Sequence, residues 1–76
     1  MNASKMLKYI IKKCRVTQID LAEKMGMNKK TLDNKFYRDN FEANDVLNIA
    51  DVLGLKVVFI DKETENIIFD TSEHKS

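Results

Sequence analysis

The 76-residue sequence contains no proline and only two glycines. Disordered chains are typically enriched in these residues and poor in apolar ones, whereas hydrophobic residues here make up 43% and charged residues 33%. The composition therefore favours a compact helical domain over a disordered chain. A chain of this length forms one domain, residues 1–76, near the lower limit of what folds alone, so association of copies would add useful stability.

Cysteine and long apolar runs are also scarce. Cys14 is the only cysteine, which excludes an intrachain disulfide and leaves packing in the first helix as its expected role. The longest apolar runs span about five residues, against the ~20 of a membrane helix and the ~7–15 of a signal-peptide core. We therefore expect a cytoplasmic protein with no membrane partner.

Residue patterns that support catalysis or metal binding are missing as well. The sequence has no nucleophile–base arrangement and no glycine-rich phosphate loop, and His74 has no second ligand nearby. Asp61, Glu63 and Glu65 alternate, but without the glycine and the spacing of a calcium loop. We expect no enzymatic activity, no cofactor and no metal, and nothing indicates a small-molecule ligand.

Basic and acidic residues separate along the chain. Residues 1–38 contain ten Lys or Arg and three Asp or Glu, a net charge of +7, whereas residues 39–76 contain three and nine, a net charge of −6. A basic half is typical of a surface that binds a polyanion, although ordinary solvated charge gives the same composition.

The apolar spacing predicts four helices. The first spans roughly residues 4–14 with Ser4 as its N-cap, and the fourth spans roughly residues 43–53 with Glu42 or Asn44 as its N-cap.

Two further helices are expected between these. Thr17 and Asp20 form a near capping box at the start of the second helix, and Gly26 ends it in the left-handed conformation. Asn28 then caps a short third helix over residues 29–36. A capped helix, a glycine-centred turn and a short second helix make a helix-turn-helix.

The third helix has one buried side and one polar side. Leu32 and Phe36 lie one turn apart, so Lys30 and Asn34 point away from the core. In a major groove, Lys donates to guanine and Asn pairs bidentately with adenine, although exposed lysines often serve only solubility. The expected DNA-binding residues are Gln18, Asn28, Lys29, Lys30, Thr31, Asn34, Lys35 and Arg38.

The stretch TQIDLAEKMGMNKKTLDNKF, residues 17–36, resembles the helix-turn-helix of Cro and phage repressors, the Cro/C1-type or XRE family. The shared features are Thr17-Gln18, Leu21-Ala22, Gly26, Met27 and Leu32, and VLNIADVLGL is similar to that family's following helix. The resemblance covers about residues 7–55. It implies a lambda-repressor-like domain of four or five helices that binds DNA as a dimer.

The resemblance also implies roles for single residues. Gln18 occupies the family's phosphate-contacting position, and Lys29, Lys30 and Asn34 occupy its base-reading positions. The chain departs from the family at Arg15, where many members carry glycine.

A β-hairpin is expected after the helices, with strands over residues 56–60 and 66–70. Alternation places Val57, Phe59, Ile67 and Phe69 on one face, and Val58, Ile60 and Ile68 on the other. One face is expected to cover the helices and the second, with Val58, Ile60 and Ile68, to form a homodimer interface; in the alternative, the hairpin only caps the core. Residues 71–76 are expected to be a flexible tail.

Together these features predict a sequence-specific DNA-binding transcriptional regulator that acts as a dimer on an inverted repeat. The alternative is a protein-interaction module of the same fold, an antitoxin-like or regulatory partner that uses the hairpin edge.

Overall fold

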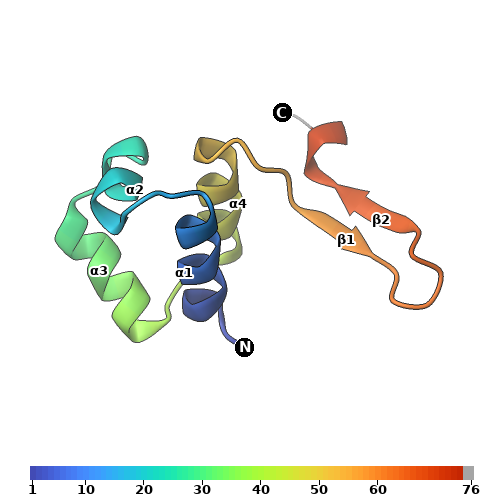
Figure 1. Ribbon diagram of the computed structural model, residues 1–76, viewed down its shortest axis with the longest axis horizontal. Coiled ribbons are helices and arrows are strands. Elements are labelled where there is room, and N and C mark those ends of the chain that lie inside the picture. The colour runs from blue at the N-terminus through green and yellow to red at the C-terminus, as the bar shows by residue number, and fades with distance from the viewer. Residues whose placement is uncertain (75–76) are drawn as a thin grey trace.

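The computed structural model describes residues 1–74 and is mainly helical, with a two-stranded antiparallel hairpin near the C-terminus (Figure 1). The elements are α1 (Ala3–Lys13), α2 (Gln18–Lys24), α3 (Lys29–Arg38), α4 (Ala43–Val52), β1 (Val58–Ile60), β2 (Ile67–Asp70) and the 3-10 helix η1 (Thr71–Glu73). The predicted helical class and the predicted order of elements are confirmed. Within residues 1–74, no helix has both the length and the apolar character needed to cross a membrane.

Each α-helix contributes one fully buried aliphatic side chain to a common core. These side chains are Leu7, Leu21, Leu32 and Ile49, each at most 1% exposed. Phe36 adds a buried aromatic ring, and the ring of Phe41 packs edge-on against it at a centroid distance of 4.9 Å. The buried positions predicted for Leu32 and Phe36 are therefore confirmed, and Phe41 anchors the α3–α4 loop.

The predicted start signals of α2, α3 and α4 are confirmed. The Thr17 hydroxyl accepts from the Asp20 N–H at 3.1 Å, and the Asp20 carboxylate accepts from the Thr17 N–H at 3.3 Å, which completes the capping box. The Asn28 side chain accepts from the Lys30 N–H at 2.7 Å, and Glu42 is the N-cap of α4.

The prediction that Ser4 caps α1 is wrong. Asn2 is the N-cap, because its side-chain oxygen reaches the Lys5 N–H at 2.9 Å. Ser4 lies inside the helix and is buried, where its hydroxyl donates to the Phe36 carbonyl at 2.7 Å. Its N–H donates to the Asp39 carboxylate at 2.8 Å, so the first turn of α1 is bonded to the end of α3.

Three helices end in the same backbone motif, in which a left-handed residue follows the C-cap. Gly26 and Gly54 hold this position after α2 and α4, with φ values of +65° and +73°. After α1 the position belongs to Arg15, with φ of +57°. The next residue, Val16, donates to the Ile11 carbonyl at 2.9 Å, which satisfies an otherwise free helix-end carbonyl.

We predict that Arg15→Gly stabilises the protein by about 0.5–1 kcal/mol. The left-handed conformation costs a non-glycine residue roughly 1–2 kcal/mol, and the extra freedom of glycine in the unfolded chain cancels about half of that. Chemical denaturation of both proteins measures the difference. Arg15→Ala is the control, because it removes the same charge and keeps the left-handed cost; an equal gain in this variant would show that charge is the cause.

The hairpin does not cover the helices, so this part of the prediction is wrong. The strands project away from the helical part (Figure 1), and Phe59, Ile60 and Ile68 are 63%, 56% and 69% exposed. The reason lies in the irregular segment after Gly54, which leads the chain away from α4 before β1 begins.

The hairpin register also differs from simple alternation. Phe59 pairs with Phe69, but a register shift then pairs Ile60 with Ile67 and leaves Ile68 as the additional residue of β2. Ile67 therefore lies opposite Ile60 and not on the face that was predicted for it, beside Phe59. Such a bulge is not visible in the sequence because β-branched residues occupy both positions.

The base of the hairpin is closed by hydrogen bonds. The Val57 N–H donates to the Thr71 hydroxyl at 2.9 Å, and the Thr71 N–H donates to the Val57 carbonyl at 3.1 Å. Asp70 is buried and accepts from the Ser72 hydroxyl and N–H and from Lys56. A flexible tail is predicted over residues 71–76, but Thr71–Glu73 form η1, and residues 75–76 lie outside the described part.

We predict that the hairpin base is acid-resistant. Hydrogen bonds from Ser72, together with Lys56, lower the pKa of Asp70 from 3.8 to about 2. Because folding favours the ionised carboxylate, its stabilising contribution is present above the unfolded pKa and is lost as the pH falls through about 2.

Amide hydrogen exchange of Val57 and Thr71, corrected for intrinsic rates, tests this expectation. Asp70→Asn should reduce their protection at pH 6, and the difference from wild type should shrink steadily between pH 4 and pH 2. Asp51→Asn, which removes an exposed carboxylate from α4, should leave both amides unchanged. If the difference in amide protection between Asp70→Asn and wild type does not change with pH, the charge of Asp70 is not the cause of the protection.

Candidate nucleic-acid interface

The candidate interface is the outer side of α3, which lies at the end of the molecule farthest from the hairpin (Figure 1). Leu21 and Ala22 of α2 are buried together with Leu32 of α3, which packs the two helices against each other across the turn at Gly26. The small side chain of Ala22 permits close approach. The packing fixes which side of α3 faces outward.

Three of the predicted site residues form the open part of this surface. Lys30, Thr31 and Asn34 are exposed, while Leu32 is inaccessible. Within residues 1–74, the side chains of Lys30 and Asn34 form no hydrogen bond to another residue. An amine, a hydroxyl and a carboxamide therefore point into solvent from one helix, with their hydrogen-bonding groups available to a partner.

Two further predicted residues, Gln18 and Lys29, are joined by an acidic residue that sequence reasoning missed. The Gln18 amide donates to Asp33 Oδ1 at 2.7 Å, and Lys29 Nζ contacts Asp33 Oδ2 at 2.6 Å. Asp33 thus links the start of α2 to the first turn of α3. The spacing of four residues between Lys29 and Asp33 was a sequence signal for their ion pair. The hydrogen bond from Gln18 to Asp33 is visible only in the fold.

The remaining predicted residues have mixed surroundings. Asn28 is exposed, and its side-chain oxygen already caps α3. Lys35 is half-buried and forms an ion pair with Asp45 of α4 at 3.3 Å, so its amine is directed toward α4. Arg38 is exposed in the last turn of α3.

The charge asymmetry of the sequence becomes an asymmetry of the fold. The basic residues 1–38 are the residues that build α1, α2 and α3, and the acidic residues 39–76 include α4 and the hairpin. Lys8 lies with its amine 5.9 Å from the centre of the Phe36 ring, so a positive charge of α1 is held beside α3. α3 and the hairpin lie at opposite ends of an elongated molecule measuring 41 × 28 × 22 Å (Figure 1).

The electrostatics of Asp33 follow from its two partners. The hydrogen bond from Lys29 is the main reason that the pKa of Asp33 lies below its ordinary value. Desolvation opposes this effect, and the hydrogen bond from Gln18 lowers the pKa further. The carboxylate is therefore ionised at neutral pH and balances the Lys29 charge. Within residues 1–74, no cluster of His, Cys, Asp or Glu has a composition suited to a metal ion.

Comparison of the chain with protein-family models, with curated proteins and with solved structures gives no match in any of the three.

We predict that Lys29→Ala raises the pKa of Asp33 toward its ordinary value, and more strongly than Gln18→Ala does. The reason is that Lys29 supplies the larger stabilisation of the carboxylate. Carbon-detected NMR titration of the Asp33 carboxyl group measures this directly. Lys30→Ala serves as the control, since it removes a neighbouring lysine that does not contact Asp33; a larger shift in this variant would mean that Asp33 responds to general charge and not to its hydrogen bonds.

Proposed function

We propose that this protein binds double-stranded DNA in a sequence-specific manner and regulates transcription. In this proposal α2 and α3 form a helix-turn-helix of the Cro/C1 type, and α3 enters the major groove. The observation that carries the proposal is the division of α3 into a buried side with Leu32 and Phe36 and an exposed side with Lys30, Thr31 and Asn34.

The size and chemistry of this surface suit base recognition. An α-helix with its side chains is about 10–12 Å in diameter and fits a major groove that is roughly 12 Å wide. Lys30 can donate to guanine O6 and N7, and Asn34 can pair with adenine N6 and N7. Thr31 can contact a thymine methyl group or a phosphate.

The flanking residues suit contacts with the phosphate backbone. Gln18 lies at the start of α2, where free backbone N–H groups favour an anion, and Lys29 lies beside it through Asp33. Arg38 extends the basic surface to the last turn of α3, whereas Lys35 is paired with Asp45 of α4. Such contacts position the protein on DNA, and the bases are read by the outward residues.

The proposal includes two copies acting together on an inverted repeat. A two-fold dimer presents two copies of α3, and half-sites about ten base pairs apart match one turn of DNA. Regulation then depends on protein concentration and on competition for the site.

A second candidate function is a protein-interaction module of the same fold, in which the hairpin binds a different protein. The exposed strands of the hairpin favour this candidate, because open strand edges and apolar side chains readily accept a partner.

Selection from random duplex DNA, followed by binding measurements on the enriched sequence, tests the proposal. We expect an enriched palindrome. Lys30→Ala combined with Asn34→Ala should lose about 2–6 kcal/mol of specific binding, since each good base contact contributes ~1–3 kcal/mol. The fold should be unaffected because both side chains are exposed.

Lys24→Ala combined with Asn48→Ala is the matched control. It removes the same two residue types from exposed positions of α2 and α4, outside both α3 and the hairpin, and should retain specific binding. Enrichment of no sequence, or equal losses in both double variants, would count against α3 as the reading element.

A further inference from the structure

Asp33 is the one acidic residue of α3, and both of its carboxylate oxygens are occupied. Oδ2 lies 2.6 Å from Lys29 Nζ, and Oδ1 accepts from Gln18 Nε2 at 2.7 Å. We call these three side chains the Asp33 bridge, which joins the first residue of α2 to the first turn of α3. A phosphate group also presents anionic oxygens to amines and amides. The bridge therefore holds an internal anion where a phosphate is expected to bind.

The Asp33 bridge lies beside the outward residues of α3 and is accessible to solvent. The side chains of Lys29 and Asp33 are 50% and 36% exposed. Asp33 follows Lys30 by three residues, which places it about 60° from Lys30 around the helix. A duplex that contacts Lys30 therefore also comes close to the Asp33 bridge.

The bridge cancels one positive charge of the candidate interface. Within residues 1–74, Lys30 and Arg38 form no ion pair, whereas Lys29 is paired with Asp33. Binding to arbitrary DNA depends on how many phosphates the protein neutralises, and each adds about 0.9 to the slope of log affinity against log salt. Lys29 therefore contributes little to this general attraction while Asp33 is beside it.

The same contacts fix the positions of two donors. The side chains of Lys and Gln have many rotamers, and ordering them on binding costs entropy. Asp33 already orders Lys29 and Gln18 in the free protein. After donating to Asp33, the Lys29 ammonium retains two N–H groups and the Gln18 amide retains one. A phosphate in one particular position can accept from these donors, whereas DNA in an arbitrary register cannot.

We propose that Asp33 determines specificity, because it positions Lys29 and Gln18 for a phosphate of the correct site and masks the charge of Lys29 from other DNA. Asp33 acts through its two partners and reads no base itself. This role rests on the proposed DNA-binding function.

A double-mutant cycle on Lys29 and Asp33 tests this role, with affinities measured for an enriched duplex and for a random duplex of equal length. At ~0.1 M salt, Asp33→Asn should bind the random duplex about eightfold more tightly, with a salt slope steeper by ~0.9, because Lys29 becomes a free cation. Lys29→Ala should bind the random duplex more weakly, because the Asp33 charge is then unpaired and repels DNA.

The double variant separates positioning from charge. Lys29→Ala with Asp33→Asn has the net charge of wild type, so its affinity for the random duplex should equal that of wild type within about twofold. Its affinity for the enriched duplex should fall about three- to tenfold, because ordered donors are lost. Asp33→Asn alone should change this affinity by less than about threefold, since the gain in charge and the loss of order oppose each other.

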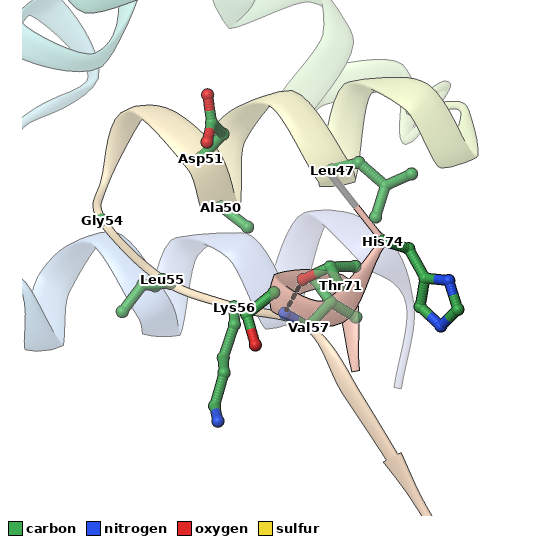
Figure 2. A pocket seen from close by; sticks show the side chains of 10 residues that line it. Leu47, Ala50, Asp51, Gly54, Leu55, Lys56, Val57, Thr71 and His74 are labelled. Atoms are coloured by element: carbon green, nitrogen blue, oxygen red, sulfur yellow. Dashed lines mark hydrogen bonds between the residues drawn. The ribbon is translucent and has the colours of Figure 1, made fainter. Parts of the chain in front are cut away.

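Asp51→Asn is the matched control for net charge. It removes the same residue type from α4, and Figure 2 shows the Asp51 side chain on the turn that precedes Gly54 and the hairpin. This variant should change neither the affinity for the random duplex nor its salt slope. Circular dichroism should show wild-type helical content in all variants, because Lys29, Asp33 and Asp51 are each at least partly exposed.

Four results would overturn this role of Asp33. Unchanged affinity of Asp33→Asn for the random duplex shows that the bridge only supports the fold, and an equal gain in Asp51→Asn shows that net charge is the cause. A double variant that discriminates as well as wild type shows that Asp33 acts by charge alone. A loss in Asp33→Asn that is confined to duplexes with one particular cytosine shows that the carboxylate reads that base.

Failure of the proposed function is seen separately, in wild type alone. Equal binding of the enriched and random duplexes by wild type removes sequence-specific binding and the positioning role together. The random-duplex measurements then decide whether Asp33 masks Lys29. Lack of binding to any duplex by all four chains of the cycle removes the masking as well.

Discussion

Burial of four aliphatic side chains, one from each helix, is the constraint on which the rest of this structure depends. Leu7, Leu21, Leu32 and Ile49 are almost completely removed from water and belong to one cluster. Because no helix of 7 to 11 residues is stable alone in water, each depends on the others through this contact. The orientation of α3 about its axis follows, since Leu32 has a single inward direction.

The surface chemistry is a consequence of that orientation. With Leu32 directed inward, Lys30 and Asn34 lie on the opposite side and are exposed to solvent. Asp33 lies between the two sides, where it can reach both α2 and the first turn of α3. The polar surface of α3 therefore has hydrogen-bonded side chains at its border, around Asp33, and solvent-exposed side chains at its centre.

Local sequence signals were sufficient for most of the helical part. The Thr17–Asp20 capping box, Gly26 and the spacing of Leu32 and Phe36 each act within a few residues, so their effects could be read directly from the sequence. The N-cap of the first helix was predicted wrongly, because Asn2 and Ser4 are both of a residue type that caps helices well. Ser4 instead forms a hydrogen bond to Phe36 of α3, a residue that lies 32 positions further along the chain.

Features that depend on distant parts of the chain could not be predicted in the same way. Alternation in the hairpin showed that both of its faces are apolar, but the direction of the hairpin depends on the irregular backbone after Gly54. The outward side of α3 was predictable from its period alone. The link from Gln18 to Asp33 was not, because it requires the crossing of two helices.

The additional residue at Ile68 has a consequence for the solubility of the chain. A bulge bends a strand and increases its twist, so a further strand laid along that edge loses the regular ladder after a few residues. Stacking of many copies into a fibril needs a flat and uninterrupted edge. The one-residue bulge at Ile68 thus opposes fibril formation by a hairpin that exposes apolar side chains.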